Sequence, residues 1–240
     1  MNALIVGYGF VGKATEITLK SFNDKINISI QDPNLGRIVH DSNIFDYVFI
    51  CVPTNLYNKK LSTSIVEKSY NQFKGIQVIR STLPPESVSL FPEATLWPEF
   101  LREVTWDIDA TQPQLTDVVG CNTNTSSFAR YLGQFREVNV VTQIEAAMFK
   151  MARNAFLSTK VTFANALKIK CDLLKIDYDN IKPLLQYSLD ATTHWDVPGP
   201  DGKLGFGGKC LPKDTTSYSS IDNDMLSTIV LMANKYYREE

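Results

Sequence analysis

Residues 3–12 of this 240-residue chain read Ala3-Leu4-Ile5-Val6-Gly7-Tyr8-Gly9-Phe10-Val11-Gly12. The apolar run at 3–6 predicts a buried strand and residues 13–20 predict a helix, so the glycines stand between a strand and a helix. Gly7 permits a tight turn, Gly9 lets a pyrophosphate approach the backbone, and Gly12 lets the helix and strand pack closely. The start of the helix offers unpaired N–H groups to phosphates. This context predicts a dinucleotide-binding turn.

Asp32 is placed to select the dinucleotide. It follows the next predicted strand, residues 26–30, and lies twenty residues after Gly12. A carboxylate at this place hydrogen-bonds a ribose 2′-hydroxyl. Because a carboxylate repels a 2′-phosphate, the sequence predicts NAD rather than NADP.

Further predicted strands cover residues 47–52, 77–80, 117–120 and 138–141, with a helix at 65–73 and a polar turn at 122–127. Strand ends of this kind face the cofactor crevice. We therefore assign cofactor contacts to the residues that end two of these strands: Val52, Pro53, Thr54, Ser81 and Thr82. The Thr82 hydroxyl either donates to a ligand or water, or satisfies a turn. For Glu99 and Glu103 the pattern alone favours a solvated helical face.

From residue 143 the pattern changes to one helix that reaches about residue 174 without Gly or Pro. Its apolar residues recur at helical spacing, and Lys150 and Asn154, four apart, share another face. These two residues form either a solvated stripe or a functional pair. Further helices are expected at 180–188 and 223–237. The prediction is an α/β chain: a Rossmann-like dinucleotide-binding domain at 1–142, followed by an all-helical domain with one long helix at 143–240.

The helical half also contains Gly205-Phe206-Gly207-Gly208-Lys209-Cys210-Leu211-Pro212-Lys213-Asp214. Glycines without a Cβ let the backbone approach a ligand closely. A thiol near a lysine ionises more easily, and the thiolate is the nucleophile. Asp214 could orient or deprotonate a water. The alternative is a glycine loop with a buried structural cysteine.

Composition narrows the class of protein. The net charge is −2, without a basic block, so no nucleic-acid or anionic-membrane partner is indicated. The four cysteines form no Cys-x-x-Cys pair and have only His40 and His194 to join them, so no metal site is predicted. The first residues contain no basic segment and no long apolar segment, so we expect no secretory leader, and no apolar run in the sequence approaches the length of a membrane span. We expect reduced thiols and a cytoplasmic location.

Taken in order, these motifs resemble the UDP-glucose/GDP-mannose 6-dehydrogenase family. The resemblance rests on the glycine turn at 7–12, Asp32, Ser-Thr-Leu-Pro at 81–84, Pro-Glu-Phe-Leu-Arg-Glu at 98–103, Lys150 with Asn154, and the stretch 205–214. The Pro-Glu-Phe-Leu and Gly-Phe-Gly-Gly-x-Cys-Leu-Pro-Lys-Asp stretches are specific to that family. The match covers nearly the whole chain.

The resemblance implies a two-step oxidation of a nucleotide sugar, from alcohol to carboxylate, with two NAD molecules. Cys210 matches the nucleophile, which captures an aldehyde as a thiohemiacetal and then carries a thioester that water hydrolyses. Asp214 matches a residue that helps activate water, and Lys150 with Asn154 matches a pair that steadies the oxyanion. Thr82 and Glu103 match residues near the catalytic water.

The resemblance also assigns the binding residues. Arg37 matches an arginine near the adenosine, and Lys213 a lysine on the cofactor side. Phe10 and Val11 join the glycines in the cofactor turn. The expected substrate contacts are Phe100, Leu101, Glu103, Lys150, Asn154, Phe206, Gly207 and Cys210.

One departure from the family concerns substrate recognition. The family carries a third, C-terminal α/β domain that holds the nucleotide of the sugar donor, and the chain ends soon after Asp214, so we expect that domain to be absent. The long helix resembles the one through which family members form dimers, which predicts a homodimer. Two alternatives remain: a single-step NAD-dependent hydroxyacid dehydrogenase, and a non-catalytic NAD-binding remnant.

Overall fold

A computed structural model describes residues 1–39, 44–112, 116–122, 126–188, 194–220 and 225–239. They form two compact units, Met1–Lys150 and Met151–Glu240. The division falls inside the long helix α5 (Gln143–Leu173), whereas the domain boundary predicted after residue 142 falls at the start of that helix. His40, residues 123–125 of the predicted turn and residues 223–224 of the predicted closing helix lie outside the described residues.

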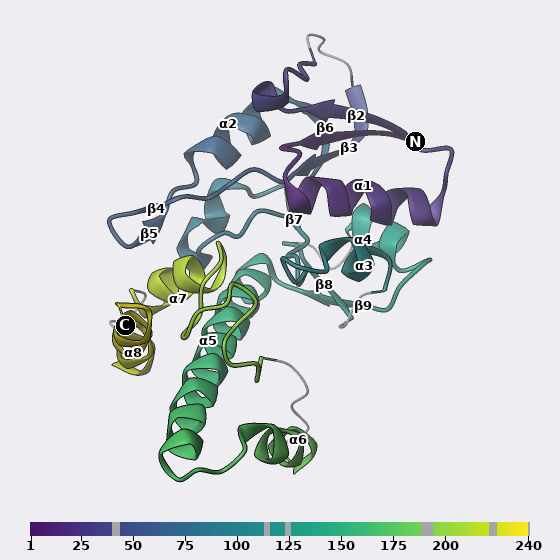
Figure 1. Cartoon of the computed structure of the whole chain (residues 1–240). Coiled ribbons are helices and arrows are strands. Elements are labelled where there is room, and N and C mark those ends of the chain that lie inside the picture. Colours follow the sequence, from purple (N-terminus) through teal and green to yellow (C-terminus); the bar gives the residue numbers. More distant parts are fainter. Residues whose placement is uncertain (40–43, 113–115, 123–125, 189–193, 221–224, 240) are drawn as a thin grey trace. The chain divides into compact units, whose positions relative to one another are not determined.

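The first unit is built on one seven-stranded sheet, which Figure 1 shows with its helices. Its strands run in the order β2-β1-β3-β6-β7-β8-β9, and every neighbouring pair is parallel except β7 and β8. The strands are β1 (Asn2–Val6), β2 (Asn27–Gln31), β3 (Ile44–Ile50), β6 (Lys74–Ile79), β7 (Thr95–Leu96), β8 (Asp117–Gly120) and β9 (Val138–Val141). The two short strands β4 (Leu56–Tyr57) and β5 (Lys60–Leu61) form a separate hairpin that the sequence did not predict.

Both faces of this sheet are covered, as expected for buried parallel strands. Alternate residues of β1 point to opposite sides: Ala3 and Ile5 join one apolar cluster, while Leu4 and Val6 join the other. The first cluster includes residues of α1 (Phe10–Phe22) and α4 (Ser127–Leu132), and α3 (Trp106–Thr111) packs against α1. The second includes residues of α2 (Ser64–Gln72), the 3₁₀ helix η2 (Pro85–Leu90) and the start of α5.

The strand order contains the point at which a ligand crevice is expected. From β1 the chain moves to β2 on one side, returns past β1, and continues on the other side with β3. In open α/β sheets, ligands bind outside the carboxyl ends of the strands where the order reverses in this way. We therefore expect the ligand crevice between the ends of β1 and β3.

A buried charge lies just beyond the end of β6. Arg80 is 5% exposed, and its guanidinium carbon lies 3.6 Å from the centre of the Trp97 ring. The Trp97 indole N–H donates to Asp117 Oδ1 at 2.7 Å. Stacking on an indole is a favourable place for a guanidinium that has left water.

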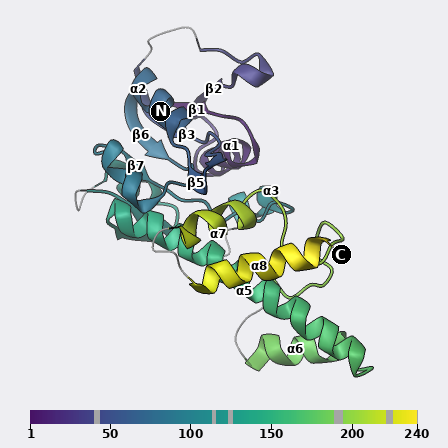
Figure 2. The same ribbon diagram turned by 90° about the vertical axis from the view of Figure 1, so that its left-hand side faces the viewer.

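The second unit is helical. It contains α5 from residue 151 onward, α6 (Tyr178–Ser188), α7 (Leu211–Ser219) and α8 (Met225–Glu239). Helices α7 and α8 pack against each other, which both views show (Figures 1 and 2). The predicted fold class, a Rossmann-like α/β part followed by a helical part with one long helix, is confirmed. None of the helices in the described part of the chain combines the length and apolar character that a membrane span requires.

Candidate active site

The glycine turn between β1 and α1 is shaped by close backbone contacts. Gly7 has φ +85°, and a Cβ there would lie 2.7 Å from the carbonyl oxygen of Cys51. A Cβ on Gly12 would lie 2.1 Å from the carbonyl oxygen of Gly7. In contrast, a Cβ on Gly9 would meet no atom within 4 Å. The first and third glycines thus permit contacts within the protein, and the middle one leaves open space.

The start of α1 borders that open space. The helix begins at Phe10 with Gly9 as its N-cap, and no side chain caps it. The amides of Phe10, Val11 and Gly12, in the first turn, therefore have no helical partner. Such a terminus fits a pyrophosphate, since it combines unpaired N–H groups with the positive end of the helix dipole.

The end of β2 contacts the glycine turn. Asp32 Oδ2 accepts the Tyr8 N–H at 2.7 Å, and Oδ1 accepts the Asn34 N–H at 3.0 Å. The Arg37 guanidinium lies over the Tyr8 ring, 5.0 Å from its centre. A carboxylate has about four lone-pair directions, so Asp32 keeps acceptor capacity for a ribose hydroxyl.

The ends of β3 and β6 are tied together by Ser81. Its buried hydroxyl donates to the carbonyl oxygen of Val52 at 2.7 Å. Next to it, Thr54 is also buried, Thr82 is half-buried and Pro53 is exposed. Ser81 therefore holds the two strand ends in place, while the side chains of Pro53 and Thr82 remain accessible to solvent at the same edge of the sheet.

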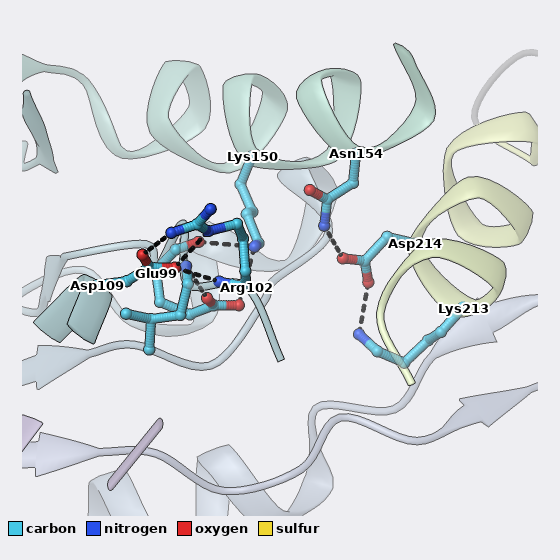
Figure 3. A network of polar contacts seen from close by, with 8 residues as sticks. Glu99, Arg102, Asp109, Lys150, Asn154, Lys213 and Asp214 are labelled. Carbon is cyan, nitrogen blue, oxygen red and sulfur yellow. Dashed lines mark hydrogen bonds and ion pairs between the residues drawn. The ribbon is translucent and has the colours of Figure 1, made fainter. Parts of the chain in front are cut away.

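Glu99 does not lie on a solvated helical face, so that expectation was wrong. It follows β7 in a stretch without helix, it is 5% exposed, and it is paired with Lys150. The Lys150 ammonium donates to Glu99 Oε1 at 2.9 Å and to the Glu99 carbonyl oxygen at 2.6 Å (Figure 3). Burial by itself raises the pKa of Glu99, but the charge and hydrogen bond of Lys150 outweigh it and hold the pKa below the usual value. Glu99 is therefore charged at neutral pH.

The residues after Glu99 surround this pair. The Leu101 N–H donates to Glu99 Oε2 at 2.8 Å, and the Phe100 ring has the Lys150 ammonium 5.6 Å from its centre. Arg102 is held by Asp109 through an ion pair of 2.6 Å. Glu103 is exposed in the turn before α3. The structure of the first unit thus brings Phe100, Leu101 and Lys150 together around Glu99.

In the second unit, Asp214 is the centre of a buried polar cluster. It is fully buried, and its Oδ2 accepts Asn154 Nδ2 at 2.6 Å while its Oδ1 accepts Lys213 Nζ at 2.5 Å (Figure 3). Asn154 is 3% exposed, so neither it nor Lys150 belongs to a solvated stripe. Lys213 neutralises Asp214, which makes the burial of that carboxylate tolerable.

Cys210 is the N-cap residue of α7 and is only partly buried, unlike Cys51, Cys121 and Cys171. The stretch 205–214 is therefore not one loop, because helix begins at Leu211. Phe206 is 2% exposed and Gly207 is half-buried.

Burial raises the pKa of the Cys51 thiol to about 11, so that cysteine stays a thiol at neutral pH.

The sequence did not indicate three of the polar residues that organise these clusters: Glu99, Asn165 and Asn234. Both asparagines lie in helices, where asparagine is a poor helix former by propensity. Asn154 in α5 has the same low propensity, so an asparagine inside a helix is one signal of a buried polar contact.

The described residues form a Rossmann-like α/β unit and a helical unit, and comparison with known proteins finds relatives of the chain. Residues 144–234 match the UDP-glucose/GDP-mannose dehydrogenase family, central domain. The resemblance inferred from the motifs is thus confirmed, and residues 144–234 are similar to the central domain of this family.

Individual relatives support the same assignment. The UDP-glucose 6-dehydrogenase of Pseudomonas aeruginosa is 30% identical over 49% of this chain and 26% of its own length. That of Rickettsia felis is 28% identical over 97% of this chain and 63% of its own length. The chain therefore spans less than two thirds of each of these relatives. A UDP-glucose dehydrogenase structure from Pyrobaculum islandicum has a TM-score of 0.81 at 21% identity, covering 98% of this chain and 68% of that one, and it supports the fold.

Proposed function

We propose that this protein is an NAD-dependent nucleotide-sugar 6-dehydrogenase of the UDP-glucose dehydrogenase type. The observation that carries the proposal is the family match over residues 144–234, because this segment contains Lys150, Asn154, Cys210 and Asp214. The relatives named above are themselves UDP-glucose 6-dehydrogenases. In this proposal residues 1–142 bind NAD, and residues 143–240 carry the cysteine and the dimer contacts.

The glycine turn, Asp32 and Arg37 fit the cofactor. Phosphates fit the uncapped start of α1, and a ribose hydroxyl fits the remaining acceptor capacity of Asp32. NAD, when bound, supplies the hydride acceptor. The residues Val52, Pro53, Thr54, Ser81 and Thr82 complete the edge of the sheet on which it would lie.

The charged residues suit the oxidation that the family resemblance implies. The Cys210 thiolate would add to an aldehyde carbon, and the thiohemiacetal would be oxidised to a thioester. Water would then break the C–S bond, releasing the carboxylic acid and restoring the thiol. Lys150 has three N–H bonds and gives two to Glu99, so one remains for a substrate oxygen. Asn154 would assist at the oxyanion, while Glu103, Asp214 and Thr82 would act at the water.

The deciding experiment is a count of NADH formed per sugar acid, with UDP-glucose, GDP-mannose and related nucleotide sugars as substrates. Two NADH for each acid would support the proposal. One NADH with a simple hydroxyacid would favour a single-step dehydrogenase, which leaves Cys210 without a role. NAD binding without any NADH formation would favour a non-catalytic remnant.

Selectivity for NAD is expected to depend on Asp32. In isothermal titration, wild-type protein should bind NAD more tightly than NADP. Asp32→Ala should weaken NAD binding by about 1.5–3 kcal/mol, because it removes hydrogen bonds to a charged acceptor. It should also narrow the difference from NADP, because the repulsion of the 2′-phosphate is lost. Asp24→Ala, at an exposed carboxylate before β2, is the control. Wild-type protein that binds NADP as tightly as NAD would contradict this role.

A homodimer through α5 is the expected assembly. The helix exposes large apolar side chains in a single chain, among them Phe156 at 64% and Phe163 at 53%. Burying one phenylalanine contributes about 1.5–3 kcal/mol, and a two-fold interface counts each contact twice. Phe156→Glu with Phe163→Glu should therefore give a monomer in sedimentation at micromolar concentration, while the control Lys168→Ala stays dimeric. A wild-type monomer would exclude the dimer.

A further inference from the structure

The stretch that precedes Cys210 is held by side chains from two helices of the second unit. Asn234 of α8 bonds both backbone groups of Phe206: its Oδ1 accepts the Phe206 N–H at 2.6 Å, and its Nδ2 donates to the Phe206 carbonyl oxygen at 3.0 Å. Asn165 of α5 accepts the Gly205 N–H at 2.9 Å. One amide side chain that bonds both groups of one residue fixes that residue in position and orientation, as a neighbouring strand would.

Arg238 extends the same contact. It lies four residues after Asn234, so the two share a face of α8. Its Nη1 donates to the carbonyl oxygen of Leu204 at 3.2 Å, and its Nη2 pairs with Asp201 at 2.6 Å. Together, the side chains of Asn165, Asn234 and Arg238 form hydrogen bonds with the backbone of residues 204–206. We call these three side chains the loop clamp.

The clamp explains two glycines that had been interpreted as space for a ligand. Gly205 has φ +72°, and a Cβ there would lie 2.4 Å from Asn234 Oδ1. A Cβ on Gly207 would lie 2.5 Å from Asp201 Oδ2 and 2.6 Å from Arg238 Nη2. These glycines therefore make room for the clamp, and that interpretation is corrected. A third glycine, Gly208, has φ +73°.

The two asparagines of the clamp are also buried, so their polar atoms require hydrogen-bond partners. Asn165 is 1% exposed, Asn234 is 8% exposed, and Phe206 between them is 2% exposed. A buried amide costs free energy unless its donors and acceptors are satisfied. Both polar atoms of Asn234 are satisfied by Phe206, four residues before Cys210.

We propose that Asn234 is a positioning residue for Cys210: by bonding both backbone groups of Phe206, it sets where the chain enters α7 and hence where the thiol lies. This inference rests on the proposed function only in taking Cys210 as the reactive group. Asn234 itself takes no part in the chemistry.

The test compares Asn234→Leu, which removes both bonds, with Asn234→Asp, which keeps an acceptor for the Phe206 N–H and loses the donor. Lys235→Met is the matched control, since Lys235 is the next residue of α8 and its side chain is 75% exposed. Two quantities are measured on folded protein: kcat and KM with NAD and UDP-glucose, and the pH midpoint of Cys210 alkylation by iodoacetamide, followed by peptide mass spectrometry.

We expect Asn234→Leu to lower kcat on the order of 100-fold with little change in KM, the scale of a misplaced reacting group. The midpoint of Cys210 alkylation should shift from the wild-type value, and Asn234→Asp should fall between the two. Unchanged kcat and an unchanged midpoint in a folded variant would overturn the proposal, as would a loss of activity with an unchanged midpoint. If Asn234→Leu does not fold, Asn234→Asp decides by the same criteria. If wild-type protein is inactive on every sugar, the proposed function fails and the alkylation midpoint alone decides the role of Asn234.

Discussion

Under the proposed function, we expect Cys210→Ser to stop formation of the acid product while NAD and the sugar nucleotide still bind. A serine hydroxyl is far less acidic than a thiol, and even an unperturbed cysteine is a few per cent thiolate at neutral pH. The first hydride step does not use Cys210, so a trace of aldehyde should still be released. Acid formation should fall on the order of 1,000-fold or more, the scale of removing a nucleophile. Wild-type protein should form two NADH for each acid.

The readout is intact-protein mass spectrometry with NAD and a sugar donor. Wild-type protein should show a covalent adduct that is missing from Cys210→Ser. Cys171→Ser is the control, because Cys171 is buried in the same unit and should keep both the adduct and the NADH count. A Cys210→Ser protein with an unchanged rate and two NADH per acid would return this cysteine to a structural role.

Lys150→Met is expected to destabilise the fold by about 3–5 kcal/mol, the cost of removing one partner from a buried ion pair. Glu99 would remain buried at 5% exposure without its cation. The double variant Glu99→Gln with Lys150→Met should recover most of the loss, since no charge is then left alone. Denaturant unfolding at neutral pH measures these differences.

Lys168→Met is the matched control. It breaks an exposed ion pair between Lys168 and Asp172, which lie one helical turn apart. Its loss should stay within about 1 kcal/mol. The pKa of Glu99 is lower in the folded protein than in the unfolded chain. The ion pair therefore contributes fully to the free energy of unfolding above the ordinary pKa of 4.5, and this contribution disappears as the pH falls through the pKa of the folded protein. Equal losses for Lys150→Met and Lys168→Met would contradict a buried pair.

Local pattern was enough to predict most of the helices and strands. The strands at 117–120 and 138–141 have the predicted bounds, and the long helix ends one residue before the predicted place. Apolar periodicity and glycine placement are properties of neighbouring residues, so a single sequence displays them. The strands at 56–57 and 60–61 have two residues each, too few to show a period, and the helix after Cys210 was not predicted.

Polar partners were harder to predict because they come from distant parts of the chain. Lys150 is 51 residues from Glu99, and Asn154 is 60 residues from Asp214. From the sequence alone, Glu99 resembled a solvated carboxylate. The lysine that pairs with it is distant in the sequence, so the residues next to Glu99 do not indicate that it is buried. Gly205 was interpreted as ligand space for the same reason, since Asn234 lies 28 residues from the Phe206 that it bonds.

The stack of Arg80 on Trp97 bears on how the first unit responds to ionic strength. Mobile ions screen charges that water reaches, over about 8–10 Å at physiological salt, but they screen buried charges much less. Arg80 is 5% exposed, so its charge is one that mobile ions screen little. Added salt therefore weakens surface pairs such as Lys168 with Asp172, while the attraction of Arg80 to its aromatic neighbour persists. We therefore expect the stack next to the end of β6 to contribute as much to the stability of the first unit at high ionic strength as in dilute buffer.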